Sequence, residues 1–500
     1  MKNSIVTILL LIMGLGINAQ PFSKDTSFVS HFDFRAQNAA VYNIHEGALG
    51  KILIGGNFQF NNGQTPHHGI VSYNRDGSLN PNYTASFNGG SIGYIIQLND
   101  SVHYLGNSLI GFLMDSLGQN ASPAWRSNIL SSIQCNEGRP YFFKDGSMLY
   151  STFQSSSTGL PCDVYLPPDT FPGSYLLKIQ PNGFWDSTFN VSISGSAGPS
   201  LIVEHDSDRL YLIGKPRRFT HYEGKAVNGL CRIFKDGRLD TTFQSPIKDT
   251  TAINSFTIKK IDSDGSIFLL GVFHLRGYSQ RFTLVKLNSN GSLDNWFMNF
   301  SGPTDTIYNL NAVNTIVETS DGGYLVGGSF NNYQNYPIRN LAKIDSVGKV
   351  EPQYFQGLGP DSSAVNGFII SSVNSIVRSK FGGYYIGGDF LRHNGLPSQP
   401  IYRIYDLQNG VGIKEQNIKT KNYRLYPNPA TNQVKLAFKV NRNEQFSFLL
   451  YDLQGRLVQE QVLQTGTKHL IELEQLKQGL YLYQIRNETG EFLSGKLVVE

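Results

Sequence analysis

The stretch Asp236-Gly237-Arg238-Leu239-Asp240-Thr241-Thr242-Phe243 decides the fold, because it is one copy of a motif that recurs along the chain. Two further clear copies lie at residues 182–189 and 290–297. Each copy joins a tight turn to an aromatic residue that closes it. This closing aromatic residue recurs seven times, as Phe28, Tyr83, Trp125, Phe189, Phe243, Phe297 and Phe355. Such self-similarity predicts one supersecondary unit that is used repeatedly.

A second marker is the phenylalanine that ends the second strand of each unit. It appears as Phe58, Phe153, Phe219, Phe273, Phe330 and Phe390. The last three intervals are about 54 to 60 residues long. The longer gap between the first two leaves room for one degenerate unit at residues 94–114. Both markers therefore predict seven units.

One unit shows the expected local structure clearly. Apolar strands are predicted at residues 313–317, 324–330 and 340–345, and a fourth short element ends in Phe355. Four short strands per unit, repeated radially, are typical of a β-propeller, in which repetition protects the strand edges. The sequence therefore predicts an all-β fold with a seven-bladed β-propeller over residues 20–410.

The order of the elements predicts how the ring closes. The first copy of the closing motif, Asp25-Thr26-Ser27-Phe28, precedes the first full unit. The last unit ends near Tyr405-Asp406 and has no fourth element of its own. We therefore expect an N-terminal strand to pair with the last blade and to complete it.

Composition supports this fold and excludes others. The 500 residues include 51 Gly, 32 Phe and 26 Tyr, and only 16% are charged, which argues against a disordered chain and against a coiled coil. The net charge of +4 is spread along the chain, whereas nucleic-acid binding needs a concentrated basic face. Glycine pairs in second strands, such as Gly327-Gly328, predict that another backbone approaches closely there.

The first 19 residues have the features of a secretory signal peptide. Lys2 precedes an apolar run of about 13 residues, and we expect cleavage after Ala19. A membrane anchor is the alternative, but a span needs ~20 apolar residues. No later segment is as apolar, so we expect an exported chain with no transmembrane segment after cleavage.

The three cysteines suggest one disulfide. Cys162 lies in the long Ser- and Pro-rich insertion of the third blade, and Cys135 lies in the loop that enters the same blade. Export permits disulfide formation, so we expect a Cys135–Cys162 bond that fastens the insertion. Cys231 starts a third strand and would by elimination be a buried free thiol.

The connections predict where a ligand could bind. Turns between strands one and two, and between strands three and four, are short and lie on one face of a propeller. The longer second-to-third-strand loops and the connections between blades lie on the other face, and loops on a rigid scaffold often carry function. The polar and aromatic candidates on these loops are His67, His68, His221, Tyr222, His274, Arg276, Tyr333, Arg392 and His393. These side chains suit sugars or other polar ligands, although turn chemistry alone also explains many of them.

Metal and cofactor sites are weakly indicated. His67, His221 and His393 could share a metal only if the ring directed their loops inward, and their blades need not be adjacent. Residues 262–266, Asp-Ser-Asp-Gly-Ser, begin like a calcium loop but lack the distal glutamate of an EF-hand. We expect no cofactor, with bound calcium as the open alternative.

A different unit follows the repeats. Residues 411–422 are polar and are typical of a linker, and residues 423–500 predict a small antiparallel β-sandwich. The latter segment resembles the type A C-terminal sorting domain of the type IX secretion system. The matching residues include Tyr426, Pro427, Asn428 and Pro429, then Asp452 and Gly455, then Gly479 and Tyr481, and finally Lys496.

This resemblance implies a route and a location. It implies passage through the periplasm of a Gram-negative bacterium and recognition by the type IX secretion machinery at the outer membrane. Removal of the sorting domain would leave the protein released or attached to surface lipopolysaccharide. The repeats themselves resemble the delta-60 repeat family, which implies no defined activity.

Two functional classes follow. The first is a non-enzymatic exported module that binds a glycan or a protein on the long-loop face. The alternative is a glycan-active hydrolase with a site at the ring axis, which would need two carboxylates ~5–9.5 Å apart. No Gly-x-Ser-x-Gly nucleophile elbow, His-Glu-x-x-His sequence or paired-carboxylate motif stands out in the sequence, so we expect the binding module.

Overall fold

The computed structural model describes residues 22–406 and 424–500 apart from several loop segments. The segments left out within these ranges are residues 26–27, 29–38, 48–49, 62–65, 84–90, 100–101, 107–110, 120, 122–137, 153–163, 167–168, 172–174, 249–254, 261–264, 298–311, 356–358, 362–370, 441–445, 453–456, 474–475 and 488–491. The expected signal peptide, the linker, Trp125, Phe153, Cys135, Cys162, Gly455 and most of the calcium-like segment lie outside the described residues.

Between residues 40 and 406 the described chain forms a series of main antiparallel sheets, each with three strands from one unit, and the last also takes up an N-terminal strand. Their strands are β2 (Ala40–Glu46), β3 (Ile52–Asn61) and β4 (Pro66–Tyr73); β5 (Tyr94–Asn99), β6 (Val102–Gly106) and β7 (Gly111–Asp115); β8 (Tyr141–Phe142), β9 (Met148–Ser151) and β12 (Leu176–Ile179); β14 (Leu201–Glu204), β15 (Arg209–Ile213) and β18 (Leu230–Phe234); β19 (Ser255–Lys260), β20 (Ile267–His274) and β21 (Arg281–Leu287); β22 (Ala312–Glu318), β23 (Tyr324–Ser329) and β24 (Leu341–Ile344); and β26 (Val373–Arg378), β27 (Tyr384–Gly388) and β30 (Ile401–Asp406). No α-helix is present in the described part of the chain, which confirms the all-β class.

In five of the described units the fourth element is shorter than expected. It pairs with the third strand through one isolated bridge, as between Ile233 and Leu239, rather than as a strand. The turn after β18 reverses the chain within six residues, and Asp240 N then donates to Arg232 O at 2.9 Å before the chain turns again.

The closing aromatic residue of the sixth unit is also one position earlier than expected. Tyr354 N donates to Glu351 O at 3.2 Å, as Phe243 N donates to Asp240 O at 3.3 Å. Tyr354 therefore occupies the position of Phe243, and Phe355 is a second buried aromatic residue beside it.

The N-terminus supplies the missing element of the last sheet, as expected. Strand β1 (Phe22–Lys24) pairs with β30, with Lys24 opposite Ile404. Asp25 N then donates to Arg403 O at 2.8 Å, which repeats the bond between Asp240 and Arg232. Residues 22–25 thus stand in the last sheet where residues 237–240 stand in their own.

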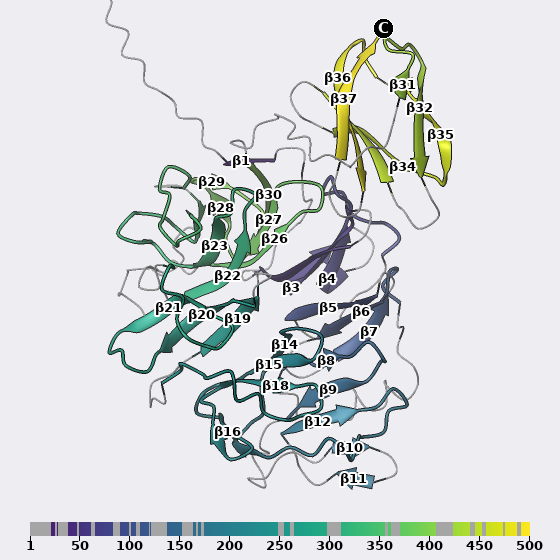
Figure 1. Cartoon of the computed structure of the whole chain (residues 1–500). Coiled ribbons are helices and arrows are strands. Elements are labelled where there is room, and N and C mark those ends of the chain that lie inside the picture. The colour runs from purple at the N-terminus through teal and green to yellow at the C-terminus, as the bar shows by residue number, and fades with distance from the viewer. Residues whose placement is uncertain are drawn as a thin grey trace, which may run out of the picture.

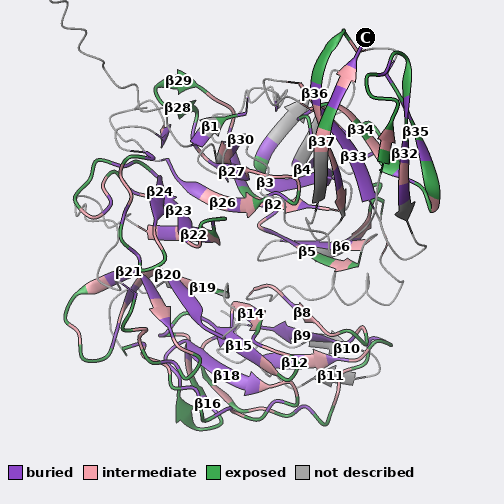
Figure 2. Ribbon diagram, turned by 45° about the horizontal axis from the view of Figure 1, so that its top comes forward, coloured by how far each residue is buried: buried purple, intermediate pink, exposed green. Residues whose placement is uncertain are grey.

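Neighbouring sheets share hydrophobic clusters, and the last sheet packs against the first. One cluster combines Phe28, Val41 and Ile44 with Tyr385 and Ile401 of the last sheet. Buried residues run along the strands while exposed residues concentrate in the connections (Figure 2). Burial of apolar side chains between sheets, at ~25 cal/mol per Å², is the main stabilising contribution.

Close approach of the next sheet explains the paired glycines. A Cβ on Gly327 would lie 2.5 Å from Cγ1 of Val373, and one on Gly387 would lie 2.7 Å from Cγ1 of Val41. The first strand of the following sheet fills the space that a side chain would need. The sequence predicted close approach of another backbone, but at Gly327 and Gly387 the approach comes from side chains of the next sheet.

Residues 424–500 form two antiparallel sheets around one core. One sheet has the order β31-β32-β35 and the other β34-β33-β36-β37. The strands are β31 (Arg424–Tyr426), β32 (Gln433–Val440), β33 (Phe446–Tyr451), β34 (Leu457–Leu463), β35 (Gly466–Glu472), β36 (Gly479–Asn487) and β37 (Phe492–Val499). Val434 and Ile471 from one sheet and Phe448 and Ile485 from the other are fully buried in this core. Figure 1 shows this unit beside β3, β4 and β30.

Candidate functional site

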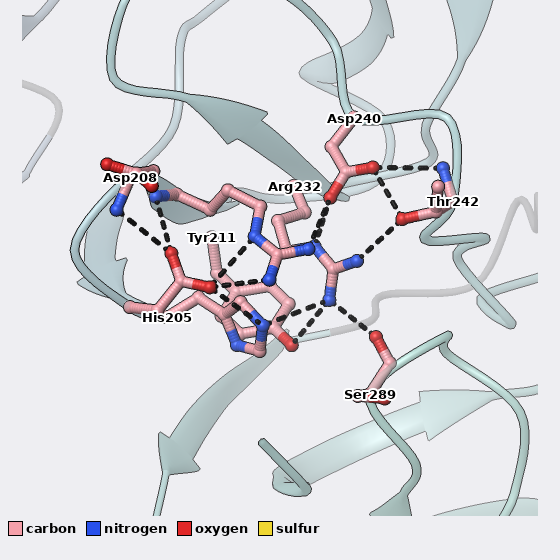
Figure 3. A network of polar contacts seen from close by, with 9 residues as sticks. His205, Asp208, Tyr211, Arg232, Asp240, Thr242 and Ser289 are labelled. Carbon is pink, nitrogen blue, oxygen red and sulfur yellow. Dashed lines mark hydrogen bonds and ion pairs between the residues drawn. The ribbon is translucent and has the colours of Figure 1, made fainter. Parts of the chain in front are cut away.

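A dense polar network surrounds Arg232 between two neighbouring sheets (Figure 3). Its Nε lies 2.6 Å from Oδ2 of Asp240, and its Nη2 lies 2.9 Å from Thr242 Oγ1. Its Nη1 donates to Ser289 O at 2.5 Å and contacts Tyr211 Oη at 3.4 Å. One guanidinium therefore links its own strand, the following turn and the next sheet.

The electrostatics of this network favour a structural role. Burial alone would raise the pKa of Asp240, but hydrogen bonds from Thr242 and Arg232 hold this pKa below its ordinary value. Burial raises the pKa of Tyr211. A carboxylate kept ionised and a phenol kept neutral are poor proton-transfer groups near neutral pH.

The same ion pair recurs around the fold, between the third strand and a residue eight positions later. The N···O distances are 3.3 Å for Lys178–Asp186, 2.6 Å for Arg232–Asp240, 3.6 Å for Lys286–Asp294 and 2.8 Å for Lys343–Glu351. In the last sheet Asp25 pairs with Arg403 instead. Sequence reasoning overlooked these pairs, although the basic–acidic spacing of eight residues was a visible signal.

Two described carboxyl groups have a raised pKa, and both bind backbone. Burial raises the pKa of Glu46, whose oxygens accept from Ser379 Oγ at 2.7 Å and Lys380 N at 2.6 Å. Burial also raises the pKa of Asp389, which accepts from Ser372 N. Each carboxyl group stabilises a turn or a strand end. Among the interactions of the described residues, none pairs Glu46 or Asp389 with a second carboxylate.

Several long connections pair with one another through short strands that were not predicted from the sequence. The loop between β15 and β18 forms a hairpin, β16 (Phe219–Tyr222) and β17 (Lys225–Ala226), which pairs with β13 (Ile193–Gly195) from the preceding connection. The loop between β27 and β30 likewise forms β28 (Arg392–His393) and β29 (Leu396–Pro397), paired with β25 (Pro360–Asp361). We call β16–β17 and β28–β29 the edge hairpins.

The edge hairpins fold back along their sheets. Tyr222 Oη in β16 donates to Gly237 O at 2.6 Å, in the turn that follows β18. The ring of His393 lies tilted against that of Tyr402 of β30, with 4.6 Å between ring centroids. Each of these two hairpins therefore packs against the third strand of its own unit or against the turn that follows it.

Burial divides the predicted ligand residues into two groups. Tyr222 and Tyr333 are fully buried and belong to the hydrophobic core, so they offer no surface to a ligand. His221 and Arg392 are exposed on the edge hairpins, and Arg276 is exposed on the loop after β20. His67 and His68 lie in β4, and only their backbone positions are described.

The two remaining histidines are partly buried and electrically neutral. Burial, reinforced by Arg281 and Lys248, lowers the pKa of His274. Burial and then Lys24 lower the pKa of His393 to about 4. Within the described ranges no three His, Cys, Asp or Glu side chains gather as a metal site would require.

The sorting motifs, far apart in sequence, meet in the C-terminal unit. Asn428 Nδ2 donates to Lys496 O at 2.7 Å, and Asn428 Oδ1 accepts from Val498 N at 2.9 Å. Gly479 pairs with Val499 in the same sheet. Tyr426 and Lys496 are exposed beside this junction. Asp452 lies at the end of β33, next to the undescribed residues 453–456.

Comparison with protein families defines the two parts of the chain. Residues 50–83, 217–243 and 263–297 match a β-propeller domain of unknown function, so the repeats form a β-propeller. Residues 424–500 match the model of a secretion system C-terminal sorting domain, and the chain therefore carries the expected sorting domain of type IX secretion. No curated protein matches the sequence.

Solved structures share only a distant likeness. PorZ, a surface component of the type IX secretion system of Porphyromonas gingivalis, is 11% identical with a TM-score of 0.37, over 92% of this chain and 59% of PorZ. A gluconolactonase from Xanthomonas campestris is 12% identical with a TM-score of 0.31, over 58% of this chain and 84% of that chain. This chain thus spans under two thirds of PorZ, and likenesses this weak carry no functional argument.

The described strands and turns include no helix long and apolar enough to cross a membrane. Cys231 is buried with a free thiol, as expected.

Proposed function

We propose that this protein is an exported binding module, a seven-bladed propeller over residues 20–410 joined by the linker 411–422 to the sorting β-sandwich at 423–500. The observation that supports binding is the contrast between two sets of polar residues. The basic–acidic pairs such as Arg232–Asp240 are buried and used in packing. The edge hairpins instead present His221 and Arg392 to solvent.

The ligand class follows from the chemistry of these exposed groups. An imidazole and a guanidinium can donate hydrogen bonds to sugar hydroxyls, to carboxylates or to backbone carbonyls. We therefore propose a glycan or a protein as ligand, bound through the edge hairpins. No described residue set suggests a cofactor, and calcium binding at residues 262–266 stays an untested alternative.

A binding assay tests this proposal directly. The double variant His221→Ala/Arg392→Ala should lose binding to glycan arrays or to partners captured from the cell surface, because it removes two exposed donors. Arg238→Ala is the matched control, since Arg238 is an exposed arginine of a short turn whose side chain is 74% exposed. Equal binding by the double variant and the control would contradict a ligand site on the edge hairpins.

A delivery assay tests the location. The sorting domain supports export to the cell surface or the medium of a Gram-negative bacterium, through the type IX machinery and with loss of residues 1–19 and 423–500. A chain that lacks residues 423–500 should accumulate in the periplasm. Undiminished surface delivery of that chain would refute the assignment.

A hydrolase site has less support. The described acidic residues near Arg232 are ion-paired, and Glu46 and Asp389 bind backbone groups. Hydrolysis of polysaccharides by the purified protein, lost on substitution of either carboxylate, would reverse this conclusion.

A further inference from the structure

The sorting domain contacts the propeller at Arg75, in the turn after β4. Arg75 Nη1 lies 3.3 Å from Glu460 Oε2 on β34, and the Arg75 side chain is 9% exposed. The same guanidinium lies 4.4 Å over the Phe381 ring of the last sheet. A nearly buried arginine with a carboxylate partner from another domain indicates a specific contact, because desolvating an unpaired charge is costly.

Arg75 stands at the seam where the first and last sheets meet. Its backbone carbonyl accepts from Arg403 Nη1 at 3.5 Å. Arg403 is held in turn by Asp25 of the N-terminal segment, through a 2.6 Å bond to Nε. A second link crosses the seam close by, where Glu46 of β2 binds Ser379 and Lys380 in the turn after β26.

These contacts form one connected series. Asp25 orients Arg403, and Arg403 contacts the backbone of Arg75. The side chain of Arg75 packs over the ring of Phe381 and contacts Glu460 on β34. The equivalent guanidinium elsewhere, Arg232, bonds the carbonyl of Ser289, whose short side chain cannot reach a carboxylate in another domain. Only at the seam, among the described sheets that carry this pair, does the chain place an arginine in contact with the sorting domain.

We propose that the sorting domain docks on the ring seam through Arg75 and Glu460, and that this docking depends on closure of the ring by Asp25 and Arg403. In an open ring the first sheet, which carries Arg75, would no longer be held against the last sheet, which carries Phe381. The docking surface that these two residues form together would then be lost. The sorting domain would then be held in place only on a completed propeller. The proposal is independent of the ligand that the propeller binds.

Charge exchange in the full chain tests the docking itself. Arg75→Glu should separate the domains by like-charge repulsion and increase the radius of gyration measured by small-angle X-ray scattering. Arg75→Glu/Glu460→Arg should restore the compact value. If Arg75→Glu leaves the radius unchanged while circular dichroism shows a folded chain, or if the exchange fails to restore it, the docking proposal is wrong.

Zero-length cross-linking tests the dependence on ring closure. In an Arg75→Lys background, carbodiimide should join Lys at position 75 to Glu460, and Glu460→Gln should abolish this product. Adding Asp25→Asn should lower the cross-link yield about tenfold, a usual size for coupling between sites. The matched control is Asp240→Asn, which breaks the same kind of pair away from the seam and should leave the yield within about twofold. Equal yields with Asp25→Asn and Asp240→Asn would overturn the proposal.

Discussion

Removing the carboxylate of Asp25 should weaken the attachment of the N-terminal segment to the last sheet, which closes the ring. Asp25 and Arg403 have side chains that are 6% and 4% exposed, and Nε and Nη2 of the guanidinium both contact Oδ2 of Asp25. In Asp25→Ala the arginine keeps two hydrogen-bond partners among the described residues, Tyr385 Oη at 3.2 Å and the Arg75 carbonyl at 3.5 Å. Neither of these partners carries a negative charge.

The expected cost follows from this geometry. Removing one partner of a buried ion pair costs about 3–5 kcal/mol, because the other charge stays desolvated. The free energy of unfolding of a whole domain is only about 5–15 kcal/mol. Asp25→Ala should therefore lower the free energy of unfolding, measured by urea denaturation of the full chain, by about 3–5 kcal/mol.

A matched substitution separates burial from charge. Asp236 pairs with Arg238 at 2.8 Å, but the two side chains are 54% and 74% exposed. Asp236→Ala should cost at most about 1 kcal/mol, as exposed pairs usually do. The variant Asp25→Leu/Arg403→Met should regain most of the lost stability, because an apolar pair can replace a buried ion pair. A loss below about 1 kcal/mol for Asp25→Ala would refute the proposed role of this pair in closing the ring.

Three further predictions concern packing, protonation and thiol reactivity, and a fourth concerns the sorting domain. Gly387→Ala should lower the free energy of unfolding by about 1–3 kcal/mol, because its Cβ would overlap Val41 and the core would be overpacked; Gly395→Ala, which meets no atom within 4 Å but has a positive φ, should cost less in urea denaturation. The pKa of His393 lies at about 4, below its ordinary 6.5, so its contribution to stability is complete above about pH 6.5 and is lost as the pH falls towards 4. His393→Phe should therefore flatten the dependence of melting temperature on pH over that range, and an unchanged slope would count against a buried neutral imidazole. Burial raises the pKa of the Cys231 thiol, so iodoacetamide should modify Cys231 only after denaturation, and mass mapping of the unreduced protein would show at the same time whether Cys135 and Cys162 are bonded. Asn428→Ala should cost about 1 kcal/mol or more in the sorting domain by removing two bonds to β37, and unaltered melting would show that these bonds contribute nothing.

The repeat pattern predicted the parts of the fold that depend on local order. The position of Asp25-Thr26-Ser27-Phe28 ahead of the first unit predicted the pairing of β1 with β30. Glycine pairs such as Gly387-Gly388 predicted close approach of a neighbouring strand. Both predictions rest on the repeat, because each unit has the same hydrogen-bond register. The residues of one copy therefore indicate the structure of the other copies.

The candidate ligand residues were harder to predict. His221 and Tyr222 are adjacent in sequence, yet one is exposed and the other fully buried. Successive strand residues point to opposite faces, and the direction depends on how the hairpin folds against its sheet. Loop composition alone could not show that Tyr222 reaches the turn at Gly237.

The sequence by itself determined the class of fold, the C-terminal sorting domain and the completion of the last sheet by the N-terminus. Strand periods, turn residues and short motifs are local signals, and each is repeated or complete within a short segment. Only the tertiary structure decided which charges are buried in pairs, which loop residues face solvent and where the sorting domain rests. Those properties depend on distances between segments such as Arg75 and Glu460, which are 385 residues apart in the chain and come into contact only in the folded structure.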